Sequence, residues 1–358
     1  MYKRQNTKSN PKVNVLIYLA LAYYLLLLIR PLFNTNLSEE LSYFRSSLAL
    51  LIIPICWILS NRASVTKSQV ARLQHLFVLS TFALGLFILV YSLVHDFIFY
   101  QDYEKIKFIY VHPVYSSLFF ITSIIICYFQ FPIKTKASRW IQILLIVFFT
   151  TLLLFMATRM VLLALFVIVL IELIRFRKKL TKTHLGVLLV SVSLCLAAVI
   201  FIKPLNKKVK EVSSFDEFVL PYHPFPTSSQ IRLGLYDCAF PLVKKHWLTG
   251  QGAHTFEQKL NHCYTKFNNH DSIHYNTHNY YLFLLASSGI FCLLFFLTMM
   301  IVQLKRAVKL RDFIYLYILI CLLLTLLTEN VLSRIQGVLF FMFFMTIFIK
   351  TSDETSQE

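Results

Sequence analysis

Three polar sites beside long apolar runs carry side chains that could do chemistry. His278 and Asn279 open the run in NTHNYYLFLLASSG, and an imidazole exchanges protons near neutral pH. Arg159 lies in FMATRMVLLALF and Arg232 in IRLGLYDCAFPLVKKHWLTGQG, and a guanidinium holds a phosphate with two parallel hydrogen bonds. Each also has a purely structural interpretation: an interfacial polar cap for His278, snorkelling for Arg159 and a solvated surface position for Arg232.

The spacing around His278 favours the start of a helix. On a helix, His278, Leu282 and Gly289 fall within roughly 40° of one another, so they share one face. The histidine lies at the start of this face, and glycine, which has no side chain, lies at its far end. Asn276 or Thr277 is expected to cap this helix, whose free N–H groups favour a nearby anion.

The 358-residue chain is 57% hydrophobic, 16% aromatic and only 15% charged, which excludes an ordinary soluble domain. Because apolar runs of roughly spanning length recur along it, we predict an all-α, polytopic membrane protein with about ten transmembrane helices. The first run is too long for a cleaved signal peptide and is expected to remain as an anchor. The runs cover residues 13–33, 41–59, 76–94, 108–129, 141–157, 160–174, 185–202, 280–304, 313–327 and 335–349.

The formal net charge of +18 is arranged as in a membrane protein rather than a nucleic-acid-binding one. Lys and Arg collect in alternate short connections, and such connections face the cytoplasm. Both termini are therefore predicted to be cytoplasmic, with the acidic connections outside. The basic connections lie at 3–12, 62–72, 134–139, 175–182 and 305–311, and the acidic ones contain Glu39, Glu40, Asp96, Asp102, Glu104 and Glu329.

The predicted organisation has four parts. Residues 1–203 hold transmembrane helices 1–7, residues 204–277 form one large external segment, residues 278–350 hold helices 8–10, and residues 351–358 form a cytoplasmic tail. External segments of this length are uncommon unless they are functional or disordered.

Within the external segment, the part from Ile231 onward predicts short amphipathic helices on the membrane surface. Pro241 is expected to break them, and Gly250 with Gly252 to close them. Cys238 and Cys263 are the only cysteines of this segment, and either a disulfide or two free thiols fits the sequence.

A transporter is the first function to test against this plan, since transporters carry ionisable groups or broken helices near mid-membrane. Here the charged residues of the apolar regions lie near the predicted ends of the runs. That arrangement favours an outer-face site for a lipid-linked or extracellular substrate.

Several motifs together resemble the O-antigen ligase and polymerase family of bacterial membrane glycosyltransferases. These are TRMVLLAL, Arg232 followed by HWLTGQGAHTF, and HNYYLFLLASSGI. The strongest part is H-N-x-x-L-x(6)-G, met by His278, Asn279, Leu282 and Gly289. VHPVYSSLF and LTENVLSRIQGVLFFMFF resemble envelope-polysaccharide ligases of that family. Because family members often have twelve spans, the resemblance implies that the count could reach twelve.

The resemblance implies a metal-independent glycosyltransferase, without a cofactor, on the periplasmic face of the bacterial cytoplasmic membrane. Its donor would be a glycan linked to a polyprenyl (undecaprenyl) diphosphate, and lipid A core would be the leading acceptor. Repeat-unit polymerisation and transfer to a protein remain alternatives. His278 would be the general base, with Arg159 and Arg232 stabilising the departing diphosphate. The expected substrate-binding residues are Asn279, Arg45 and Glu329.

Two alternatives for the chemistry stay open. The base could be a carboxylate in the first external loops, and the available residues are Glu39, Glu40, Asp102 and Glu104. His270, His274 and His278 recur every fourth residue and on one helix could bind zinc. The surrounding NHDSIHYNTHN favours turns over helix, and no H-E-x-x-H is present.

Overall fold

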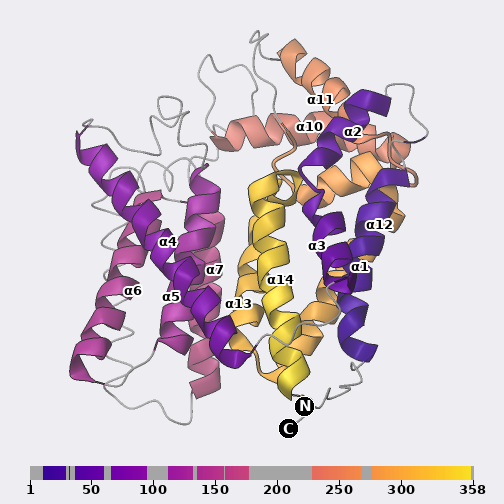
Figure 1. Ribbon diagram of the computed structural model, residues 1–358. Helices are drawn as coiled ribbons and strands as arrows, with labels where there is room; N and C mark the ends of the chain where they lie inside the picture. The colour runs from indigo at the N-terminus through magenta and orange to yellow at the C-terminus, as the bar shows by residue number, and fades with distance from the viewer. Residues whose placement is uncertain are drawn as a thin grey trace. The chain divides into compact units, whose positions relative to one another are not determined.

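The computed structural model describes residues 11–29, 32, 37–59, 66–94, 112–131, 135–156, 158–176, 228–267 and 276–355 (Figure 1). All secondary structure in these ranges is helical, which confirms the predicted all-α class. The first seven helices are α1 (Pro11–Ile29), α2 (Leu37–Arg45), α3 (Ala49–Leu59), α4 (Lys67–Val94), α5 (Pro113–Gln130), α6 (Lys136–Met156) and α7 (Arg159–Phe176). They are followed by α10 (Ser228–His246), α11 (Ala253–Phe267), α12 (Tyr280–Leu310), α13 (Phe313–Thr325), a 3-10 helix η5 (Val331–Ser333) and α14 (Ile335–Thr355).

The helices confirm a polytopic membrane protein. Within the described residues, α4, α5, α6 and α12 are each long and apolar enough to cross a bilayer, and α2 with α3 would make a fifth, bent crossing. Shorter apolar helices cover Val15–Ile29, Phe313–Thr325 and Ile335–Ile349. The predicted run 185–202 lies outside the described residues, so the count of about ten stays a prediction.

The run 41–59, predicted as one span, is instead two helices bent by 62°. The bend falls at a turn in which the Ser47 N–H donates to the Phe44 carbonyl oxygen at 3.0 Å. At the same turn the Ser46 hydroxyl donates to the carbonyl oxygen of Ser333, the last residue of η5, at 2.8 Å. Hydropathy alone missed the bend because it averages over a window, and the strongly apolar α3 outweighs the short turn and the more polar α2 before it.

The chain divides into two compact units, which we describe separately. Unit 1 contains the described residues within 1–70, 235–319 and 326–358, and unit 2 contains those within 71–234 and 320–325. In unit 1, α1 packs against α3 and α12, and α14 packs against α3 and η5. The buried hydroxyls of Tyr23 on α1 and Tyr280 on α12 lie 2.7 Å apart, so one donates to the other inside this core.

Unit 2 is built mainly from α4 to α7. Helix α5 packs against α6 and α7, and the rings of Phe82 on α4 and Phe148 on α6 have centroids 4.9 Å apart. Helix α6 ends at Met156 and α7 begins at Arg159, close to the ends of the predicted runs 141–157 and 160–174.

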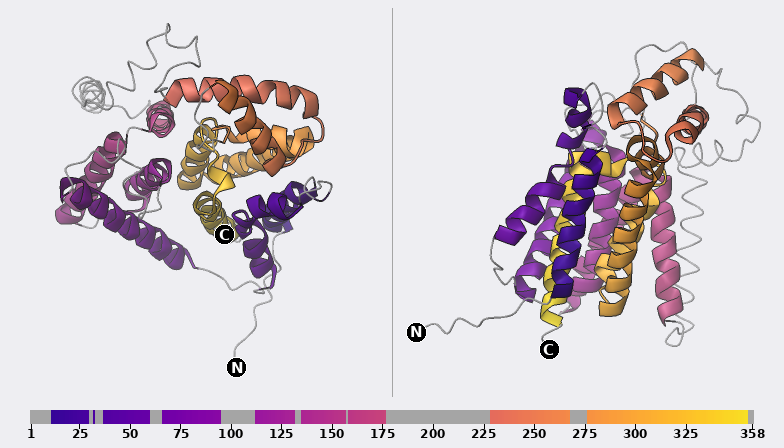
Figure 2. Two further views of the ribbon diagram at one scale, coloured as in Figure 1. Left: turned by 90° about the horizontal axis from the view of Figure 1, so that it is seen from above. Right: turned by 90° about the vertical axis from the view of Figure 1, so that its right-hand side faces the viewer.

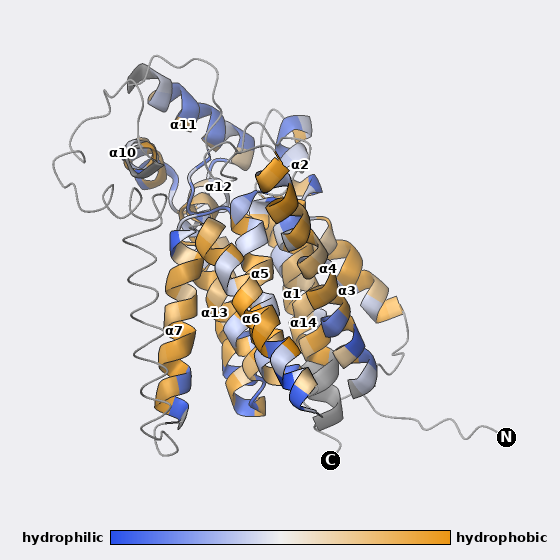
Figure 3. Cartoon of the chain, turned by 90° about the vertical axis from the view of Figure 1, so that its left-hand side faces the viewer, coloured by the Kyte–Doolittle hydropathy of each residue, from blue (hydrophilic) through white to orange (hydrophobic). Residues whose placement is uncertain are grey.

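Helices α10 and α11 differ from the others in polarity. Figure 3 shows α11 as largely hydrophilic, in contrast to the orange, hydrophobic α7. In both views of Figure 2, α10 and α11 lie side by side. The predicted break at Pro241 is wrong, because α10 continues through it to His246. A proline costs a helix one hydrogen bond, and the buried residues Cys238, Ala239 and Val243 on either side supply packing that offsets the loss.

Candidate functional site

His278 is paired with a carboxylate in unit 1. Its Nδ1 lies 3.1 Å from Oε2 of Glu329, and the two side chains are 23% and 15% exposed. An ionised carboxylate only accepts hydrogen bonds, so this pairing places the ring proton on Nδ1. The Nε2 atom is then the basic nitrogen of the neutral ring.

Two chain segments are held together to make this pair. The Asn330 amide donates to the Thr277 hydroxyl at 3.1 Å, and that hydroxyl donates to the Asn279 carbonyl oxygen at 3.0 Å. The Tyr280 N–H donates to the Leu326 carbonyl oxygen at 2.9 Å. Thr277 and Asn330 are buried, so these bonds are shielded from water. The segment before α12 is thereby fixed against the segment after α13, which carries Glu329.

The backbone around His278 corrects two expectations. Asn279, rather than Asn276 or Thr277, caps α12 by accepting from the Leu282 N–H at 3.0 Å. His278 therefore precedes the helix and does not share a helical face with Leu282 and Gly289. Its φ is +46°, a left-handed value uncommon outside glycine, and its N–H donates to Asn276 Oδ1 at 2.9 Å. The side-chain oxygens of Asn276 and Asn279 hold the turn that this strained residue occupies.

Gly289 serves a close approach of two backbones. Helix α12 is kinked there, with φ 83° and ψ 177°, a conformation that is essentially confined to glycine. The kink frees backbone groups, and the turn between α10 and α11 binds them. Gln251 N–H donates to the Ala286 carbonyl oxygen at 3.0 Å, Gly252 N–H to that of Ser287 at 2.9 Å, and the Ile290 N–H donates to the Trp247 carbonyl oxygen at 2.9 Å.

The turn between α10 and α11 likewise leaves no space for a side chain at Gly250. A Cβ on Gly250, whose φ is +68°, would lie 2.3 Å from the Ser287 carbonyl oxygen. A Cβ on Gly289 would lie 2.4 Å from the Leu248 carbonyl oxygen. The glycines of LTGQG and of H-N-x-x-L-x(6)-G are therefore two halves of one contact, which we call the glycine contact.

Glu40 joins α2 to α11. It is fully buried, and its carboxylate accepts from the backbone N–H groups of His254 and Thr255 at 3.0 and 3.1 Å and from the Thr255 hydroxyl at 3.0 Å. A carboxylate at a helix start satisfies free N–H groups and complements the helix dipole. The burial of Glu40 and its capping role argue against this residue as the base. Of the other three residues named as alternative bases, Glu39 is exposed on α2, and Asp102 and Glu104 lie outside the described residues.

A second α2–α11 contact involves Glu257. The Tyr43 hydroxyl donates to its carboxylate, and burial raises the pKa of the Glu257 carboxyl above its ordinary value. The Tyr43 hydrogen bond and the charge of Arg334 act against that rise. One turn earlier, His254 Nε2 lies 2.5 Å from a carboxylate oxygen of Glu39. These contacts fix α11 and the turn before it.

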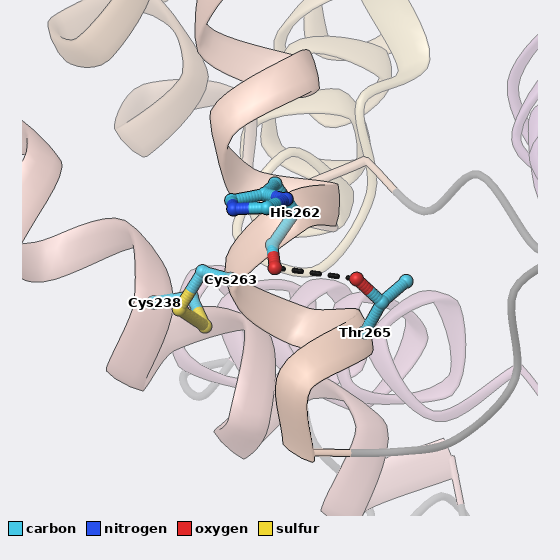
Figure 4. Close-up of a disulfide and its surroundings, with 4 residues drawn as sticks. All are labelled: Cys238, His262, Cys263 and Thr265. Carbon is cyan, nitrogen blue, oxygen red and sulfur yellow. Dashed lines mark hydrogen bonds between the residues drawn. A yellow bond between two sulfur atoms is a disulfide. The ribbon is translucent and has the colours of Figure 1, made fainter.

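Cys238 on α10 and Cys263 on α11 form a disulfide, with Cα atoms 5.8 Å apart (Figure 4). This settles the pairing that the sequence left open. Together with Glu40, the disulfide anchors the two helices that flank the glycine contact.

We expect removal of this disulfide to reduce stability without abolishing the fold. Cross-links of this loop length stabilise a protein by about 3 kcal/mol, mainly by restricting the unfolded chain. The double variant Cys238→Ser/Cys263→Ser should therefore melt at a lower temperature in detergent than the wild type. Cys56→Ser, a free and exposed cysteine on α3, is the matched control. Free thiols at both positions in unreduced peptide mass spectra would contradict the pairing.

The remaining predicted site residues fall in different places. Arg45 is exposed at the end of α2, in unit 1. Arg159 begins α7 and Arg232 lies in α10, and both belong to unit 2, so their convergence on His278 stays a prediction. Both are half-buried. For the zinc alternative, His270 and His274 lie outside the described residues, within which no group of three or more potential ligands could hold a metal.

Sequence reasoning missed the partnership of Glu329 with His278 and the capping role of Glu40. The sequence predicts Glu329 as a substrate-binding residue and places Glu40 among the carboxylates of the first external loops. No local motif signals either role, because the partners are 51 and 214 residues away in sequence.

Fold and site together define a multi-pass helical membrane protein with a histidine–carboxylate pair beside a helix start. Residues 143–297 match the family model described as O-antigen ligase, which confirms the resemblance seen in the motifs. Over this stretch, which is less than half of the chain, the protein is similar to the O-antigen ligase family. The match contains Arg159, Arg232, His278, Asn279 and Gly289 but ends before Glu329. No curated protein sequence matches the chain.

Proposed function

We propose that the protein transfers a glycan from a polyprenyl diphosphate to an acceptor hydroxyl, with attachment to lipid A core as the leading reaction. The observation that carries the proposal is the His278–Glu329 pair next to the start of α12, in which His278 lies within the stretch similar to the O-antigen ligase family. The positive-inside pattern of the sequence supports a site on the periplasmic face.

In this proposal His278 is the general base. The acceptor oxygen forms a bond to the anomeric carbon of the donor sugar while the bond from that carbon to the diphosphate oxygen breaks. The acceptor proton passes to Nε2 of His278, and the Glu329 carboxylate stabilises the imidazolium that results. The electron pair of the broken bond stays on the diphosphate, whose growing charge needs fixed cations.

Arg159 and Arg232 are our candidates for those cations. Both are half-buried, and guanidinium groups bind phosphate oxygens in pairs. Asn279 caps α12 with its side-chain oxygen, and in this proposal it also belongs to the substrate-binding residues. Arg45, exposed on α2, remains a candidate for contact with a charged acceptor.

Deleting the gene and separating the envelope glycans on a gel tests the reaction class. A ligase predicts loss of all long chains attached to lipid A, whereas a polymerase predicts caps of a single repeat unit. Unchanged glycans together with altered uptake of a solute would overturn the enzyme proposal in favour of a transporter.

Glu329→Gln tests the pair itself. The amide keeps the shape of the carboxylate but not the charge that stabilises an imidazolium, so we expect transfer to fall roughly 10-fold or more. The assay is transfer by purified protein across pH 5 to 9. A matched control is Glu172→Gln, whose carboxylate pairs with Arg175 on α7. A wild-type rate in Glu329→Gln would show that the carboxylate is not needed for transfer, and a reduced rate together with less folded protein would assign Glu329 a structural role only.

A further inference from the structure

Unit 2 contains an apolar crevice of about 350 Å³ that the proposed transfer reaction does not use. Three helices line it: α4 contributes His75, Leu79 and Phe82, the end of α5 contributes Phe131, and α6 contributes Leu145. Its volume lies within the range of small-molecule sites in proteins. His75 is the one imidazole of the lining, which also includes the Cys127 thiol, and its Nε2 lies 3.4 Å from the Gln130 carbonyl oxygen.

The crevice continues toward a cation on the same stripe of α4. Arg72, His75, Leu79 and Phe82 are spaced by three, four and three residues, so they share one face of the helix. The last three line the crevice, and Arg72 therefore stands one turn beyond it, exposed. An occupant with an apolar chain and an anionic end would meet both features at once.

The surroundings of Arg72 are basic. The stretches KSQVARLQH at the start of α4 and KASRWIQ at the start of α6 contain no Asp or Glu. Lys136 and Arg139 are exposed in the second stretch, and Trp140, 65% exposed, is a residue type that favours the level of lipid headgroups. Glu172 also lies near the end of α5, and Arg175 already pairs with it at 2.6 Å.

The crevice lies toward the end of unit 2 opposite Arg159. It uses the last residues of the α5 region and the first half of α6, whereas Arg159 follows the last residue of α6 across a tight connection. A lipid held here would thus be distinct from a donor diphosphate bound at Arg159. The positive-inside pattern assigns this basic end to the cytoplasmic leaflet, where anionic phospholipids are enriched.

We propose that the crevice binds an anionic glycerophospholipid, with one acyl chain between α4 and α6 and its phosphate at Arg72 beside His75. The acyl chain would cover the apolar walls of the crevice. The basic residues at its end would attract an anionic headgroup more strongly than a zwitterionic one, which carries no net charge. This inference is independent of the glycan reaction and of the acceptor.

Native mass spectrometry of the full chain, released from nanodiscs of phosphatidylethanolamine and phosphatidylglycerol, tests it. We expect one retained phosphatidylglycerol. One Lys or Arg near the membrane surface contributes about 1 kcal/mol to binding of anionic lipid, so Arg72→Gln should lower its retention about fivefold. Leu79→Trp and Leu145→Trp, which fill the crevice from two sides, should abolish retention.

Matched controls separate the crevice from the general lipid surface. Leu76→Trp changes an exposed leucine of α4 outside the lining, and Lys309→Gln removes an exposed cation of α12 in unit 1. Both should retain the lipid, and all variants are compared at equal monodispersity. Equal retention of the two lipids would overturn the proposal, as would loss of lipid in Leu76→Trp to the same degree. A retained polyprenyl lipid in place of phosphatidylglycerol would assign the crevice to the donor chain instead.

Discussion

Replacement of His278 by alanine is expected to lower glycan transfer by about 10² to 10⁴, the usual contribution of a general base. The imidazole is 23% exposed and its backbone is held by the Asn276 side chain, so the fold should tolerate the change. An alanine at position 278 would adopt the same left-handed backbone conformation, so the substitution adds little to the strain that the histidine already carries. The measurement is transfer by purified protein with a polyprenyl diphosphate-linked donor, beside the amount of folded protein in the membrane.

His262→Ala is the matched control for this variant. His262 is an exposed histidine on α11 whose side chain lies outside the pair with Glu329. It should leave the rate near that of the wild type. If His278→Ala retains wild-type transfer, the base lies elsewhere, and Asp102 and Glu104 become the candidates. Inhibition by EDTA would restore the zinc alternative.

Gly289→Ala is expected to have the largest effect on stability. The alanine Cβ would lie 2.4 Å from the Leu248 carbonyl oxygen, on a backbone with φ 83° and ψ 177°. The conformation alone costs about 1–3 kcal/mol for a residue with a Cβ, and the overlap with rigid backbone adds to that cost. We expect the turn to separate from α12, with lower levels of folded protein and a lower melting temperature. Gly250→Ala should behave alike, because it meets the Ser287 carbonyl oxygen at 2.3 Å.

Ser288→Ala, next to the kink, is the control for both glycine variants. Ser288 lies next to Gly289, and its replacement by alanine removes only a hydroxyl near the glycine contact. This change should shift the melting temperature little. A wild-type melting temperature for Gly289→Ala would show that the kink and its contact with the turn are not needed. A normal fold with reduced transfer would instead assign the glycine contact to positioning of the site.

The sequence alone determined the class of protein and most of its helices. In a bilayer every backbone group must be paired within the segment, so a long apolar run has little choice but helix. For this reason the runs beginning near residues 280, 313 and 335 became α12, α13 and α14 with nearly the expected bounds. The family motif likewise identified His278 and Gly289, because it specifies a histidine and a glycine at a fixed spacing.

Only the tertiary structure decided what those residues contact. The partner of His278 is Glu329, 51 residues later, and the partner of Gly289 is a turn between two other helices. The bend between α2 and α3 and the burial of Glu40 also depend on distant segments, which supply Ser333 and the start of α11. Hydropathy and helical period describe one segment at a time, whereas hydrogen bonds and backbone contacts between segments arise only when the chain brings them together.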